Sequence, residues 1–202
     1  MIDRFKDDYE FLSNFADSPF TYEGRKFPTV EHAYQAYKSL DPAIFKAIAE
    51  AKTPGDAKRA GRSVVNLRPD WDCYKLWLMY KLVQAKFAQN DGLAYKLLNT
   101  NDEMLVEGNT WGDRFWGQVD GQGENMLGKV LMIVRQDLRP DPKLLTRSGS
   151  GGRVSDRIYF MYPETITAAQ AKWLQYKAGY HPGGYGFNSF SGKTWNCAGN
   201  CD

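Results

Sequence analysis

The sequence has few of the residues that most often act in catalysis or bind metals. Among 202 residues there are two histidines and three cysteines. A pair of histidines working as acid and base is therefore nearly excluded, so acid–base chemistry would fall to carboxylates, lysine or tyrosine. Three cysteines in a chain of this length do not form a disulfide framework. Cys73 falls in an apolar helical stretch, which indicates a buried and inert thiol.

The remaining cysteines, Cys197 and Cys201, lie near the end of the chain with His181 upstream. A closed zinc site needs about four ligands at close spacing, so this set favours a disulfide or two idle thiols. We expect neither a metal nor a cofactor.

Long apolar runs and a strong charge of one sign are also missing. No stretch approaches the roughly 18 apolar residues of a membrane span, and residues 1–11 lack the apolar core of a signal peptide. We therefore expect no membrane partner and a cytoplasmic location. The net charge of +2 gives no general attraction to nucleic acid. The chain has no Walker loop, no HExxH zinc motif and no nucleophile elbow.

What the sequence does have is a helical pattern over its first 140 or so residues. Apolar residues recur at helical spacing along Pro69–Ala88, and Pro or Thr marks the start of several other helical stretches. These patterns predict helices over 29–40, 42–51, 54–61, 69–88, 91–98 and 124–138. Short strands are expected at 2–5, 20–22 and 104–106. The fold class is a helix-dominated α+β domain over residues 1–145.

Beyond that domain the composition changes. Residues 146–157 contain SGSGG, which is typical of a flexible linker. Residues 158–202 form a small extension rich in glycine and aromatic residues. A piece of this size is small for a core of its own, so we expect it to contact the main domain or a protein partner, or to be partly ordered.

Two stretches carry candidate functional groups. In the first helix Glu31, Gln35 and Lys38 are spaced i, i+4 and i+7, which places a carboxylate, an amide and an amine on one face. Such a face is either a solvated stripe or a pocket wall. The adjacent His32 is more typical of a packed or capping residue than of a base.

The second stretch, EGNTWGDRFWGQ, holds two tryptophans in a sequence otherwise typical of loops. Trp111 and Trp116 either fill a core or form the wall of a pocket with Asp113 between them. The glycine after the first indole, Gly112, leaves room for a planar base against the ring.

Five motifs in order resemble the YbiA-like NADAR family: FLSNF, PTVEHAYQAYK, AKRAGR, LVEGNTWGDRFWG and GENMLGKVLMIVR. The resemblance covers about residues 2–138. It implies an N-glycosidase that acts on a ribosylated heterocycle. The substrate would be either an early riboflavin-pathway intermediate or ADP-ribose attached to guanine, and this guanine can be part of a nucleic acid.

The resemblance also implies roles for particular residues. Glu31 and Asp113 would stabilise the developing cation, hold the ribose or activate water. Lys38 would bind phosphate, protonate the leaving nitrogen or, as a neutral amine, form a Schiff base. The expected substrate-binding residues are Asn14, Gln35, Trp111, Gly112, Trp116 and Asn125. The same lining would also serve a non-catalytic ADP-ribose-binding module, and a third reading is an interaction protein that uses the C-terminal extension.

Overall fold

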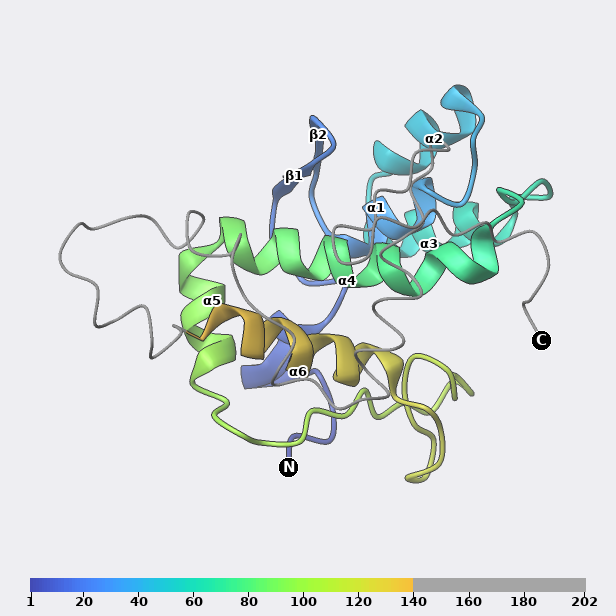
Figure 1. Cartoon of the computed structure of the whole chain (residues 1–202). Coiled ribbons are helices and arrows are strands. Elements are labelled where there is room, and N and C mark those ends of the chain that lie inside the picture. The colour runs from blue at the N-terminus through green and yellow to red at the C-terminus, as the bar shows by residue number, and fades with distance from the viewer. Residues whose placement is uncertain (140–202) are drawn as a thin grey trace, which may run out of the picture.

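The computed structural model describes residues 1–139, and a long central helix organises them. This helix, α4 (Trp71–Gln89), contacts α1, β1, α5 and α6. In Figure 1 it crosses the middle of the molecule, with α6 on one side and the β1–β2 hairpin and α1–α3 on the other. The elements in order are η1 (Asp7–Leu12), β1 (Phe20–Tyr22), β2 (Arg25–Phe27), α1 (Val30–Ala36), α2 (Pro42–Ala49), α3 (Pro54–Arg62), α4, α5 (Asp91–Leu98) and α6 (Met126–Leu138).

All six predicted helices are present, and local capping explains where three of them begin. Thr29 accepts a hydrogen bond from the His32 amide at the start of α1, and Asp41 and Thr53 cap α2 and α3 in the same way. The first helix ends earlier than expected, at Ala36. The reason is that the Lys38 carbonyl accepts a hydrogen bond from the Arg68 amide at 2.8 Å, which fixes the chain in a turn.

The strands were predicted less well than the helices. Phe20–Tyr22 is a strand as expected, but its antiparallel partner Arg25–Phe27 was not predicted. The expected strands at 2–5 and 104–106 meet each other in a single parallel bridge, Ile2 with Leu105. Left-handed backbone at Asp7 then turns the chain into the short 3-10 helix η1, so the pairing does not extend.

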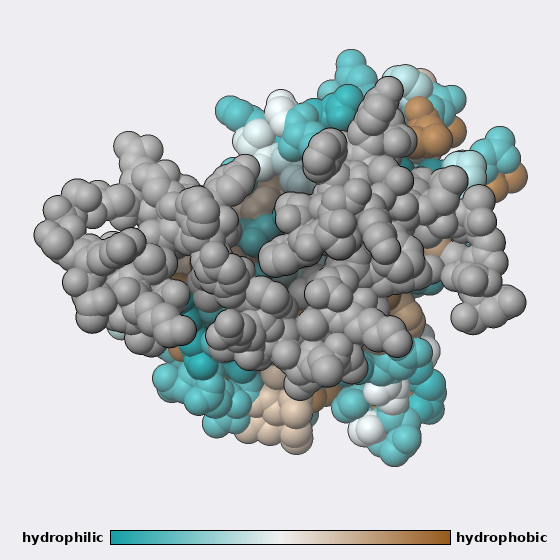
Figure 2. Space-filling model, in the orientation of Figure 1, coloured by the Kyte–Doolittle hydropathy of each residue, from teal (hydrophilic) through white to brown (hydrophobic). Residues whose placement is uncertain are grey.

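The core lies between α4, α6 and α1. The predicted apolar face of α6 is buried at Leu127, Val130, Leu131 and Val134, and Cys73 is a buried free thiol on α4. Where residues 1–139 are visible in Figure 2, their outer surface is mainly hydrophilic with scattered hydrophobic residues. No helix within this part of the chain is both long and apolar enough to cross a membrane.

The expected linker, 146–157, and extension, 158–202, lie outside the described residues. The same holds for His181, Cys197 and Cys201, so these predictions stay predictions.

Candidate active site

A cavity of about 560 Å³ brings together residues from six separate segments. Seven of the nine sequence-predicted site residues line it, among them all three predicted catalytic residues. The full lining is Phe5, Lys6, Ser13, Asn14, Phe15, Glu31, Tyr34, Gln35, Lys38, Lys58, Arg62, Trp71, Met79, Glu107, Gly108, Trp111, Asp113, Trp116 and Leu127.

The polar face of α1 forms one wall of this cavity. Glu31 and Gln35 are both buried, and the Gln35 amide donates a hydrogen bond to Glu31 Oε1 at 2.7 Å. The Glu31 amide in turn donates to the Asn14 carbonyl at 3.0 Å, which ties the helix to the FLSNF loop. Burial raises the pKa of the Glu31 carboxyl, while the Gln35 hydrogen bond and nearby cations oppose the rise. The face is a pocket wall and not a solvated stripe.

Lys38 lies in the turn after α1, beneath two aromatic rings. Its Nζ is 5.9 Å from the ring centre of Tyr34 and 5.7 Å from that of Trp71. Burial lowers the pKa of the Lys38 amine; the Glu31 carboxylate opposes this, and the nearby cations Arg62 and Lys58 add to it. The balance favours the neutral amine more than in a solvated lysine, which is the condition that nucleophilic attack requires.

The loop 107–118 contributes another part of the cavity lining. Asp113 Oδ1 accepts hydrogen bonds from the amides of Phe115 and Trp116. The Asn109 side chain donates a hydrogen bond to the Asp113 carbonyl and accepts one from the Asp113 amide. The loop therefore holds one Asp113 oxygen in a tight turn. Trp116 packs edge-to-face on Tyr34 and against the core, whereas Trp111 is 55% exposed.

Three other residues singled out in the sequence lie elsewhere. Gly112, at φ +89°, follows Trp111 but is not part of the lining, and a Cβ added there would meet open space. Asn125 is buried but does not line the cavity. Its side chain donates a hydrogen bond to the Leu105 carbonyl and accepts one from the Glu107 amide. His32 caps α1 through Thr29 and lies 3.1 Å from the Ala51 carbonyl, so it is a structural residue.

The sequence profile of the NADAR domain matches residues 2–139, which is nearly all of the described chain. The chain belongs to the NADAR domain family. The resemblance inferred from the five motifs is thereby confirmed, and the cavity lies wholly inside the NADAR domain.

Individual relatives agree with this membership. N-glycosidase YbiA of Escherichia coli (strain K12) is 40% identical over 134 residues, which are 65% of this chain and 83% of the relative. An N-glycosidase of Nostoc punctiforme is 42% identical over 136 residues, covering 65% of this chain and 86% of the relative. The NMR structure of E. coli YbiA matches with a TM-score of 0.64 at 36% identity, covering 75% of this chain and 94% of YbiA.

A riboflavin biosynthesis protein of Vibrio vulnificus is also 37% identical over 135 residues, 66% of this chain and 36% of that longer protein. The curated relatives include N-glycosidases, which are hydrolases, and on this basis the chain is an enzyme of that class.

The cavity of about 560 Å³, called the NADAR cavity from here on, also contains functional groups that were not identified from the sequence. Lys58 and Arg62 enter it from α3, and both belong to the AKRAGR motif. Lys58 Nζ lies 5.3 Å from the ring centre of Phe15 and 5.8 Å from that of Trp111. Glu107 lines the same cavity, and burial, with the Asp113 carboxylate nearby, raises the pKa of its carboxyl to about 7. The helical spacing of Lys58 and Arg62 in the AKRAGR motif was the signal available for the two cations. Glu107 is the first residue of the stretch EGNTWGDRFWGQ, but it was not singled out there.

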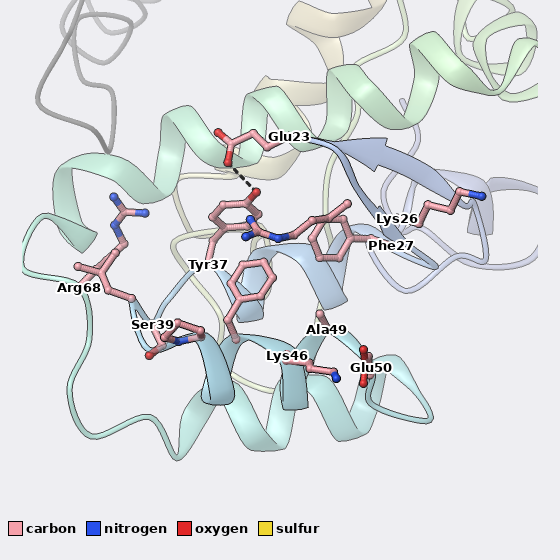
Figure 3. Close-up of a pocket in the computed structure, with 13 residues that line it drawn as sticks. Glu23, Lys26, Phe27, Tyr37, Ser39, Lys46, Ala49, Glu50 and Arg68 are labelled. Carbon is pink, nitrogen blue, oxygen red and sulfur yellow. Dashed lines mark hydrogen bonds between the residues drawn. The ribbon is translucent and has the colours of Figure 1, made fainter.

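A second and larger hollow, about 850 Å³, lies between the β-hairpin and α2 (Figure 3). Tyr37 donates a hydrogen bond to Glu23 there, and Arg68 forms an ion pair with Asp70. The aromatic rings beneath it pack on one another, as Phe45 does on Tyr37. None of the three predicted catalytic residues lines this hollow, so the NADAR cavity is the candidate active site despite its smaller volume.

Proposed function

We propose that the chain hydrolyses the C–N bond between the anomeric carbon of a phosphorylated ribose and a heterocyclic base or amine nitrogen. The observation that carries this proposal is one cavity lined by Glu31, Lys38 and Asp113 together with an exposed indole. Breaking this bond builds positive charge on the anomeric carbon, which nearby carboxylates stabilise. The arrangement of the cavity supports this chemistry.

Lys38 is the proposed nucleophile. Its Nζ attacks the anomeric carbon, the C–N electron pair leaves with the base, and the resulting ring-opened Schiff base is hydrolysed by water. The lowered pKa of Lys38 supports this route. Glu31, which shares the wall with Lys38, stabilises the charge that develops at the sugar or on the imine.

The rest of the lining supports a nucleotide-like substrate. Trp111 offers an exposed flat surface on which the base can stack. Lys58, Arg62 and Lys6 place positive charge around the cavity, which suits a phosphate or pyrophosphate on the ribose. Asn14 and Gln35 also line the cavity, and we expect them to orient the sugar through hydrogen bonds.

Two substrates share this chemistry: a ribosylaminopyrimidine phosphate of the riboflavin pathway and ADP-ribose linked to guanine. Mass spectrometry after incubation with each substrate separates them. We expect the wild-type enzyme to release free base from at least one.

The Lys38→Ala variant is expected to lose more than about a hundredfold in kcat, because the nucleophile is removed while the cavity remains. Borohydride added during turnover is expected to trap a covalent sugar adduct on wild-type enzyme and none on this variant. The matched control is Lys129→Ala, an exposed lysine on α6, which should keep both activity and adduct.

Full activity of Lys38→Ala would overturn the role of Lys38. An active wild type that never yields an adduct would leave the hydrolysis standing but replace the imine route by direct attack of water. A wild type that releases no base from either substrate would overturn the proposed function itself.

A further inference from the structure

Glu107 occupies a closely fixed position at the inner side of the loop 107–118. Its amide donates to Asn125 Oδ1 at 3.0 Å, and its carbonyl accepts from the Gln118 amide at 2.9 Å. Across the loop, a Cβ on Gly117 would overlap the Glu107 carbonyl oxygen and lie 3.0 Å from Glu107 Cγ. The loop is therefore built so that the Glu107 side chain fits against a glycine and extends into the cavity.

The end of this side chain has no hydrogen-bond partner in the part of the chain that the structure describes. Glu107 Oε2 is buried and has no hydrogen-bond partner among residues 1–139. A buried polar atom without a partner is uncommon and calls for an explanation, such as a role in catalysis or binding. In a cavity that receives a substrate, that partner can be a substrate atom.

The other two carboxyl groups of the cavity differ in this respect. Glu31 Oε1 accepts a hydrogen bond from Gln35, and Asp113 Oδ1 accepts two from backbone amides. The charged groups that act on Glu107 are the Asp113 carboxylate and the cations Lys58 and Lys6. Burial and Asp113 favour a protonated Glu107 at neutral pH, and the two lysines oppose this.

We propose that Glu107 is the general acid of the reaction and donates its proton to the leaving nitrogen of the base. This inference rests on the proposed hydrolysis of a ribosyl C–N bond. As that bond breaks, its electron pair goes to the base nitrogen, which takes the proton from Glu107 and leaves as the free base. Lys38 Nζ forms the new bond to the anomeric carbon. Water then hydrolyses the Schiff base and supplies the oxygen that ends on this carbon, and the remaining proton of water restores the Glu107 carboxyl.

The test is the Glu107→Gln variant, assayed from pH 5.5 to 8.5 on whichever substrate the wild type hydrolyses. Wild-type kcat is expected to fall as the pH rises through about 7, because the acid loses its proton. The variant is expected to lose about 10²- to 10⁴-fold in kcat, to keep its KM within a few-fold, and to lack that fall. Glu124→Gln, an exposed glutamate of the same loop region, is the matched control and should behave as wild type.

If Glu107→Gln folds poorly, a second variant tests the same role of Glu107. In Glu107→Ala, added imidazole is expected to restore part of kcat, because the imidazolium ion has a pKa of about 6.5 and can donate its proton from the vacated space. Retention of kcat and of its pH profile in Glu107→Gln, or a change in KM alone, would overturn the proposal while leaving the function intact. Absence of imidazole rescue in a folded Glu107→Ala would also count against it. A wild type inactive on both substrates would overturn both proposals.

Discussion

Glu31 and Glu107 line the same cavity, but their surroundings differ. Glu31 shares a helix with its hydrogen-bond partner Gln35, so the contact follows from i, i+4 spacing. Glu107 lies in a loop, and its burial depends on Gly117, ten positions along the chain, having no side chain. The first residue was found from the sequence because its signal is local. The second was missed because its position depends on how a loop folds back on itself.

Burial also lowers the pKa of a lysine outside the active site, Lys86. This α4 lysine is 1% exposed, and its Nζ donates to the Ser13 carbonyl at 2.9 Å. Burial lowers the pKa of Lys86 from 10.5 to about 7. The unfolded chain therefore binds one more proton than the folded chain between these two values, so this residue makes folding more favourable as the pH rises.

We expect the Lys86 contribution to the free energy of unfolding to increase by about 1.4 kcal/mol per pH unit between pH 7 and 10. Urea unfolding of wild type and of Lys86→Met across this range measures the difference, because the methionine cannot titrate. The Met variant should have its largest relative advantage at or below pH 7. A stability difference between the two proteins that does not change with pH would contradict the lowered pKa.

At the scale of elements, the sequence predicted what local interactions determine. The caps Thr29, Asp41 and Thr53 and the apolar stripe of α4 are local, so the helices were placed within a few residues. The Ile2–Leu105 bridge and the β2 strand depend on distant or weakly patterned partners, and they were predicted wrongly or missed. The contribution of α3 to the cavity also depends on distant segments, because only the packing of α3 against α1 brings Lys58 and Arg62 to the cavity.

The contact between α1 and α3 gives an element-scale prediction. A Cβ on Gly61 of α3 would overlap the Gln35 amide and lie 2.8 Å from Gln35 Cβ and Cδ, so the helices would have to separate. We expect Gly61→Ala to destabilise the fold by about 1–3 kcal/mol, although alanine favours helices by up to about 1 kcal/mol. It should also lower kcat, because Gln35 would lose its position beside Glu31.

Gly92→Ala in α5 is the matched control, since a Cβ there meets nothing within 4 Å. We expect it to stabilise the fold by about 0.4–1 kcal/mol. Thermal and urea unfolding of both variants provide the measurement. A Gly61→Ala protein as stable as Gly92→Ala would show that α1 and α3 are not packed this closely.

At the scale of the whole molecule, the cavity draws its residues from segments between Phe5 and Leu127. The NADAR profile covers residues 2–139, and the E. coli YbiA structure is 94% covered by its match to this chain. Every group used in the proposed mechanism therefore lies in the part shared with the family. We therefore predict that residues 158–202 are not needed for the chemistry.

Deleting residues 147–202 is accordingly expected to leave kcat/KM within about threefold of the full chain, a change below about 0.7 kcal/mol. The assay is release of free base from the substrate that the full chain hydrolyses. A deletion that begins at residue 131 is the control, because it removes Leu131 and Val134, which are fully buried on α6, and should abolish folding. If the shorter deletion instead raises KM by tenfold or more while circular dichroism shows an intact fold, residues of the extension contribute to substrate binding. The boundary between the catalytic domain and the extension would then have to be moved toward the C-terminus.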